Sequence, residues 1–151
     1  MAYMKLVKLF ALAALASSIS SLAASVDVSE IDGVIKNLDL TSFPNSVGPR
    51  RLPGKSTFAD YGFVRVKRAI AGAEVVRDDN SWSMGFRIVS ANPTSLRLCF
   101  YDRALGTPGD VFVPTYNTTS ALLISKSQRG AWTAKQVPAG FKNCKNYPEV
   151  A

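Results

Sequence analysis

The most regular pattern in the chain is an alternation of apolar and polar residues between positions 82 and 103. The alternation pauses at the segment Asn92–Thr94 and then resumes. A period of two is typical of a β-strand, so this segment predicts two antiparallel strands joined by a short turn. The large residues that share one face of the predicted hairpin are Trp82, Met84, Phe86, Ile88, Leu96, Leu98 and Phe100.

The length of the turn sets the register of this hairpin. A three-residue loop over 92–94 places Ala91 opposite Ser95 and Ile88 opposite Leu98, which keeps the large apolar residues on one face. A two-residue loop would shift the pairing by one residue and mix the two faces, so we exclude it.

Shorter patterns predict further strands on both sides of the hairpin. Strands are expected over 61–69, 73–77 and 111–113, and a second hairpin over 119–126 and 131–137. In that second hairpin a loop at Gln128–Gly130 puts Leu122 and Ile124 on the face of Trp132 and Ala134. The fold class is therefore mostly β, with about six antiparallel strands closed as a small barrel or folded as a sandwich.

The region before these strands predicts one short helix and an irregular arm. A single helical stripe is formed by Val28, Ile31, Val34, Ile35 and Leu38. Ser29 is the expected N-cap, while Gly33 weakens the helix. Prolines and glycines then exclude a regular element up to residue 57. We therefore expect an N-terminal arm over 25–57 and a β-domain with a C-terminal tail over 58–151.

The first 24 residues have the pattern of a secretory signal peptide. Lys5 and Lys8 precede a short apolar run, and small residues from Ala23 to Ser25 offer the cleavage site. The alternative is a membrane anchor, but the run falls short of the roughly 20 apolar residues that a spanning helix needs. We expect a secreted or periplasmic protein whose mature form has no membrane span.

Charge is distributed unevenly along a chain with a net charge of +7. Four acids and one base lie between residues 25 and 49, whereas 15 bases and seven acids follow from Arg50 onward. A basic body attracts anionic partners over long distances, although many soluble proteins are basic for solubility alone. Nucleic acid, acidic glycans, lipid head groups and acidic proteins are the partner classes that this balance favours.

The two cysteines, Cys99 and Cys144, are expected to form one disulfide in an oxidising compartment. The sequence contains no histidine, and two thiols do not make a zinc site, so we expect neither a metal nor another cofactor. The triplet Asn117–Thr119 fits the N-glycosylation pattern in a predicted loop, which matters only in a eukaryotic source.

Nucleophilic catalysis of the usual kind needs a base beside the nucleophile, most often a histidine, and this chain has none. A pair of carboxylates could act as general acid and base, and the candidates are Asp60, Glu74, Asp102 and Asp110. None of them stands in a motif, so we do not expect an enzyme. A small carboxylate-dependent hydrolase remains an alternative.

The polar face of the central hairpin is the main candidate binding surface. Basic residues interleaved with an aromatic on a sheet face can bind single-stranded nucleic acid or a glycan. A second basic group lies in the proline-rich arm. The candidate anion-binding residues from both places are Arg50, Arg51, Lys55, Arg65, Lys67, Arg87, Arg97, Tyr101 and Arg103.

These observations favour a secreted or periplasmic binding protein without enzymatic activity, such as an inhibitor, an immunity-type partner or an effector. The expected partner is a protein. Binding of a polyanion through the basic sheet face is the second hypothesis. A disulfide at Cys99 would also bring the C-terminal tail across this face and cover part of it.

Overall fold

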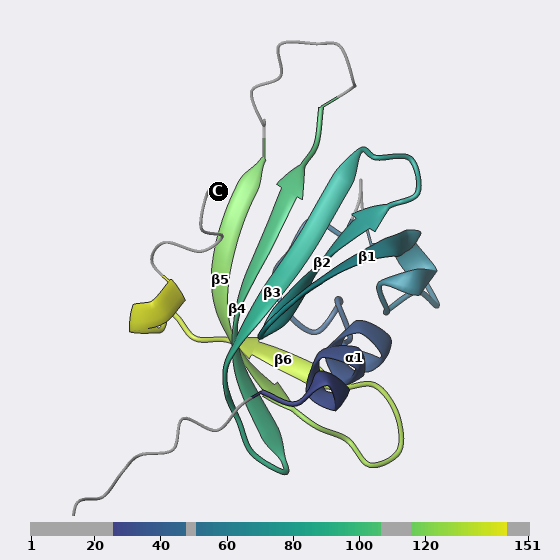
Figure 1. Ribbon diagram of the computed structural model, residues 1–151. Helices are drawn as coiled ribbons and strands as arrows, with labels where there is room; N and C mark the ends of the chain where they lie inside the picture. The colour runs from purple at the N-terminus through teal and green to yellow at the C-terminus, as the bar shows by residue number, and fades with distance from the viewer. Residues whose placement is uncertain (1–25, 48–50, 107–115, 145–151) are drawn as a thin grey trace, which may run out of the picture.

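The computed structural model describes residues 26–47, 51–106 and 116–144 (Figure 1). Its elements are α1 (Val28–Asn37), η1 (Ala59–Tyr61), β1 (Phe63–Ala69), β2 (Gly72–Arg77), β3 (Trp82–Ala91), β4 (Ser95–Ala104), β5 (Asn117–Ser125), β6 (Thr133–Gln136) and η2 (Lys142–Cys144). The expected signal peptide, the strand at 111–113, Arg50 and Asp110 lie outside the described residues. None of the helices in the described ranges is long and apolar enough to cross a membrane.

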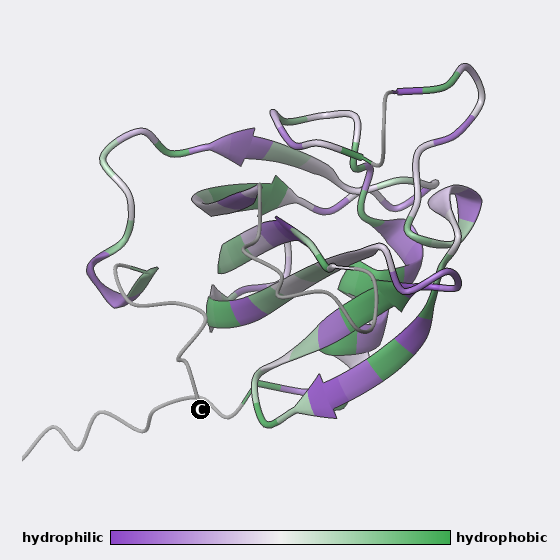
Figure 2. Ribbon diagram, turned by 90° about the horizontal axis from the view of Figure 1, so that it is seen from above, coloured by the Kyte–Doolittle hydropathy of each residue, from purple (hydrophilic) through white to green (hydrophobic). Residues whose placement is uncertain are grey.

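The six strands form one antiparallel sheet in the order β1-β2-β3-β4-β5-β6, so every strand pairs with its neighbour in sequence. The predicted mostly β fold, with six strands, one short helix and one disulfide, is confirmed. Within the described residues no pairing joins β1 to β6, and the sheet is therefore open rather than closed into a barrel. Figure 2 shows hydrophobic and hydrophilic positions alternating along the strands, as a sheet with two unlike faces requires.

The central hairpin has the predicted register over most of its length. Ile88 lies opposite Leu98, as the sequence pattern required. The predicted closing pair of Ala91 with Ser95 is wrong, because Ala91 lies opposite Leu96. An irregularity in β3 after Ile88 adds one residue to that strand, so the connecting loop is one residue longer than predicted.

The second hairpin also keeps its predicted register but is shorter than expected. Its last pair is Ser125 with Thr133, and Ile124 faces Ala134 on the buried side. Trp132 leaves this ladder and bonds the end of the helix instead. Its backbone N–H donates to Asn37 O at 2.6 Å, and its carbonyl oxygen accepts from Asp39 N at 2.8 Å. The loop of the hairpin is therefore wider than the three residues predicted.

The predicted helix is confirmed as α1, with a different N-cap. Asp27 caps the helix by accepting from Ser29 N at 3.1 Å, so the prediction of Ser29 as the cap is wrong. Packing explains the glycine at position 33 of the helix, because a Cβ there would lie 2.3 Å from the ring of Trp132. The glycine that weakened the helix prediction thus allows the indole to lie directly against α1.

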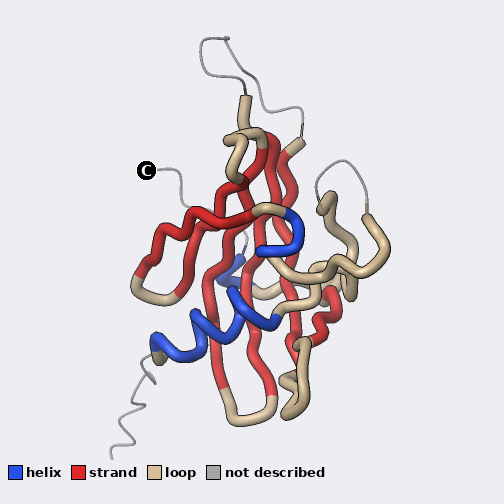
Figure 3. The backbone as a smooth tube through the Cα atoms, turned by 90° about the vertical axis from the view of Figure 1, so that its right-hand side faces the viewer, coloured by secondary structure: helices blue, strands red, loops and turns tan. Residues whose placement is uncertain are grey.

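The helix and the arm cover one face of the sheet, which we call the inner face (Figure 3). Phe43 of the arm packs edge-on against Phe100 of β4, with ring centroids 5.1 Å apart. The arm also blocks the outer edge of β6, because Ala134 N donates to Ser42 Oγ at 2.8 Å. One core therefore joins arm, helix and sheet; its largest fully buried side chains are Phe58, Phe86, Phe100, Ile31, Leu38, Leu40, Met84, Leu96, Leu98, Leu122, Ile124 and Val34.

Candidate functional site

The face of the sheet turned away from α1, here called the outer face, carries the candidate site. Strand register aligns its side chains in rows that cross the strands. One row runs Arg65, Val76, Ser83, Arg103 and Asn117; the next runs Lys67, Glu74, Gly85, Tyr101 and Thr119; a third contains Gly72, Arg87, Cys99 and Ala121. Arg97 precedes Cys99 by two residues and takes the neighbouring outward position of β4.

The half of the outer face nearest β1 holds an open pocket of about 230 Å³, here called the basic pocket. Arg65 and Lys67 reach it from β1 and Arg103 from β4, three strands away. Glu74 of β2 lies among these three cations. The other residues that line the pocket are Val76, Asn80 and Leu105.

The cations are held in place by hydrogen bonds and charge. Arg103 donates from Nη2 to Glu74 Oε1 at 2.7 Å and from Nε to Ser83 Oγ at 2.9 Å. Lys67 Nζ lies 3.8 Å from the other carboxylate oxygen of Glu74 and remains 75% exposed. Arg65 donates to Arg77 O at 2.8 Å and to Asn80 Oδ1. Three cations face one carboxylate, which leaves the pocket with a surplus of two positive charges.

Glu74 is ionised in this setting. Burial opposes its charged form, but the hydrogen bond and the charge of Arg103, together with hydrogen bonds from Ser83 and Tyr101, lower the pKa of Glu74 below its ordinary value. The carboxylate therefore serves to orient Arg103 and is not held in a protonated form that could donate a proton.

Tyr101 lies on the outer face as predicted, but it is only 4% exposed. Its ring lies across β3 at Gly85, where a Cβ would come within 2.4 Å of the ring carbons. The guanidinium of Arg103 lies over the same ring, 5.1 Å from its centroid. Tyr101 is thus a support for Arg103 and offers little surface on which a ligand could stack.

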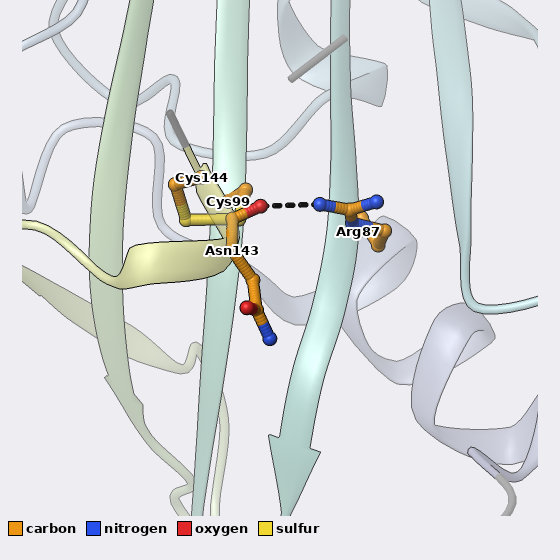
Figure 4. Close-up of a disulfide and its surroundings, with 4 residues drawn as sticks. All are labelled: Arg87, Cys99, Asn143 and Cys144. Carbon is orange, nitrogen blue, oxygen red and sulfur yellow. Dashed lines mark hydrogen bonds between the residues drawn. A yellow bond between two sulfur atoms is a disulfide. The ribbon is translucent and has the colours of Figure 1, made fainter. Parts of the chain in front are cut away.

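The other half of the outer face is covered by the C-terminal tail, residues Val137–Cys144. The predicted disulfide Cys99–Cys144 is confirmed, with the two Cα atoms 5.3 Å apart, and it fastens the tail to β4 (Figure 4). Arg87 of β3 points toward the tail and donates to Asn143 O (Figure 4). The Arg97 guanidinium lies 5.7 Å from the centroid of the Phe141 ring. Both arginines are therefore engaged by the tail.

A hollow of about 560 Å³ lies where the tail passes β5. It is lined by Thr119, Ala121, Ala139, Gly140, Phe141, Lys142 and Cys144. The tail is joined to the sheet by the disulfide, by the hydrogen bond from Arg87 and by the hydrogen bond from Val137 N to Ala121 O of β5 at 2.8 Å.

The remaining candidate residues do not join this surface. Arg51 donates to the carbonyl oxygens of Thr41 at 2.6 Å and of Phe43 at 2.5 Å, so its hydrogen bonds join two parts of the N-terminal arm. Lys55 is exposed in the turn before η1. The structure thus brings Arg65, Lys67, Tyr101 and Arg103 together, places Arg87 and the still exposed Arg97 beside the tail, and leaves Arg51 and Lys55 elsewhere.

The candidate catalytic carboxylates lie apart from one another. Glu74 is on the outer face, whereas Asp102 belongs to the inner face and is fully buried. Asp60 is the second residue of η1 and accepts from Thr57 N at 2.9 Å and from Ser56 N at 3.0 Å, and these backbone hydrogen bonds lower its pKa. No two of these three come together as a general acid and base.

The sequence analysis considered Glu74 and Asp102 only as catalytic candidates and missed the positions that they take in the sheet. Glu74 belongs to the basic pocket, which only the alignment of β2 with β1 and β3 could reveal. Asp102 occupies an inward position of β4, where the alternation calls for an apolar residue. The signal for Asp102 was present, because a charge on the core side of a strand needs buried partners.

Asn117 is the first residue of β5 and pairs with Arg103 across the ladder, so the prediction that it lies in a loop is wrong.

Comparison of the chain with protein-family models, with curated proteins and with solved structures gives no match.

Proposed function

We propose that this protein acts by binding rather than by catalysis, and that the basic pocket receives an anionic group of its partner. The observation that supports this is the convergence of Arg65, Lys67 and Arg103 from two separate strands around one carboxylate. A carboxylate, a sulfate or a phosphate has the charge that this pocket lacks. The partner is then a protein with an acidic surface or a polyanion.

Rigidity of the cations favours this use. Ser83, Glu74 and the ring of Tyr101 fix the guanidinium of Arg103 before any partner arrives. Little side-chain entropy is then lost when it binds an anion. Lys67 is largely exposed and can shift from Glu74 to an incoming group at small cost, because exposed ion pairs contribute little.

The proposed location is outside the cytoplasm, secreted or periplasmic. The Cys99–Cys144 disulfide supports an oxidising compartment, and the basic and apolar start of the sequence supports export. An acidic partner in the same compartment could be steered to the protein by its positive field.

The test is a salt titration of binding to heparin, a model polyanion, with two variants of equal charge. Arg65→Gln/Lys67→Gln removes two pocket cations. Lys36→Gln/Arg129→Gln removes two exposed cations from α1 and from the β5–β6 loop. Log K falls as log salt rises, and we expect this dependence to become shallower by roughly 1.4 in the pocket variant. That figure corresponds to about 0.7 for each of two lost contacts, as for single-stranded polyanions. The slope of the control variant should stay near the parent value. Equal changes in both variants would reject the pocket as the binding site.

A further inference from the structure

We propose that the edge of β1 that faces away from β2 receives an extended acidic segment of a partner protein, which adds to the sheet as a further strand. This inference rests on the proposed function of the basic pocket and names the partner as a protein. Strand addition combines backbone hydrogen bonds to an open edge with side-chain contacts on alternate residues.

This edge of β1 offers backbone groups that other parts of the fold leave unused. β1 is the last strand at its end of the sheet, and among the described residues no strand or β-bridge pairs with it on this side (Figure 1). Within the same residues, the one backbone hydrogen bond of β1 outside the sheet is from Phe63 N to Phe58 O at 2.9 Å, at the first residue of the strand. Alternate residues after Phe63 therefore turn their N–H and C=O groups outward, where another strand can bond them.

The side chains of β1 select the charge of the added strand. Arg65, Lys67 and Arg68 are all exposed, and β1 contains no acid. Neighbouring strands lie about 4.8 Å apart, so carboxylates on an added strand would stand directly beside these cations. A second copy of β1 would instead bring cations close to cations, which disfavours it as the occupant.

The acids already present leave the outer side of this edge positively charged. On the inner side, Arg68 is matched by Asp32 of α1, with Nη2 and Oδ1 2.8 Å apart. On the outer side, Glu74 faces Lys67 together with the two arginines of the basic pocket. The added strand is therefore expected to carry acids on the residues of its outer face and uncharged, β-branched residues between them, because the latter favour a strand.

Two exposed apolar side chains flank the cations of β1. Val64, at the irregularity near the start of the strand, is 58% exposed. Ile70, in the turn that follows the strand, is 98% exposed. Burial of these side chains by the ends of an added segment would contribute to its binding. The edge is thus cationic along the strand and apolar at both ends.

The test measures the binding of two synthetic peptides to the full chain with its disulfide intact. One peptide has four Thr-Glu repeats and the other four Pro-Glu repeats, both with blocked ends. Their charges are equal, but proline lacks the N–H that a strand uses for pairing. We expect calorimetry to show that the Thr-Glu peptide binds at least about tenfold more tightly.

Hydrogen exchange locates the bound peptide. The Thr-Glu peptide should slow exchange at the amides of β1, whereas the amides of β6 serve as the internal control and should not change. The Arg65→Gln/Lys67→Gln variant should bind this peptide more weakly than the parent, and Lys36→Gln/Arg129→Gln should bind it like the parent.

The proposal is overturned by equal affinity for the two peptides, by binding of neither, or by unchanged exchange in β1. Heparin binding that depends on Arg65 and Lys67, with no preference between the peptides, would assign the pocket to a polyanion and reject strand addition. Failure of the proposed function looks different. In that case heparin binding is the same in the parent and in Arg65→Gln/Lys67→Gln, whatever the peptides do.

Discussion

The carboxylate of Asp102 accepts two hydrogen bonds from Ser46, one from its backbone N–H at 2.7 Å and one from its hydroxyl at 2.6 Å. Trp82 Nε1 donates to the other oxygen. A fully buried charge in β4 thereby fixes the arm, 56 residues earlier in the chain, to the sheet. The same charge and the burial of Tyr116 raise the pKa of that tyrosine, with burial as the larger cause.

Replacing this carboxylate should destabilise the fold. Asp102→Asn puts an amide N–H₂ where donors already converge, so we expect a loss of about 2–4 kcal/mol in the free energy of unfolding. The control is Asp32→Asn, which breaks an exposed ion pair with Arg68 and should cost less than about 1 kcal/mol. Urea denaturation checks both values, and equal losses would show that Asp102 is not an anchor of the arm.

Gly85 should not tolerate a side chain. In Gly85→Ala the new methyl group meets the ring of Tyr101, and overpacking of this kind costs about 1–3 kcal/mol. Gly130→Ala is the control, because no atom lies within 4 Å of a Cβ there. The double variant Gly85→Ala/Tyr101→Ala should lose less than the sum of its single changes. Strict additivity in thermal unfolding would contradict the contact.

Stability should depend on pH through Glu74. Its pKa is lowered in the folded state, so its contribution is present above the ordinary carboxyl pKa and is lost as pH falls through the lowered value. The Glu74→Gln variant should therefore show a smaller fall in stability between about pH 5 and pH 3 than the parent. Asp27, Asp60 and Asp79 also have lowered pKa values, so the variant keeps part of the dependence. Identical pH curves would show that Arg103 does not stabilise this carboxylate.

The disulfide should stabilise the protein without being needed for its core. It closes a separation of 45 residues, which corresponds to roughly 4 kcal/mol on the chain-entropy model. The Cys99→Ser/Cys144→Ser variant should unfold at a lower temperature, yet keep its aromatic circular dichroism at 25 °C. Dithiothreitol should lower the melting temperature of the parent and leave that of the variant unchanged.

Local periodicity was enough to predict the six described strands and most of their register, although β1 begins at Phe63 and not at residue 61, which belongs to η1. The alternation through β3 and β4 fixed which residues face the core, and even cysteine pairing followed from the count of two. The end of the β3–β4 hairpin could not be predicted, because the irregularity after Ile88 depends on the loop. There Asn92 Oδ1 accepts from Ser95 N at 2.7 Å and from Thr94 N at 3.1 Å.

The candidate binding surface was only partly predictable, because parity along a strand gives the face of a residue and not its neighbours. Arg65, Lys67 and Arg103 share the basic pocket, as the strand order β1 to β4 allows. The same parity placed Arg87 and Arg97 on the outer face, where the tail engages them. The exposure of Tyr101 was misjudged since the space that buries it is created by Gly85 on another strand.

The block on the outer edge of β6 has a consequence for self-association. Ser42 and the end of α1 occupy the backbone groups of Ala134 and Trp132, so that edge is closed to another chain. Across the described residues, β1 is the end of the sheet without such a block. Two copies joined strand to strand through β1 would have no second edge to offer, and the assembly would stop at a dimer instead of growing into a fibril.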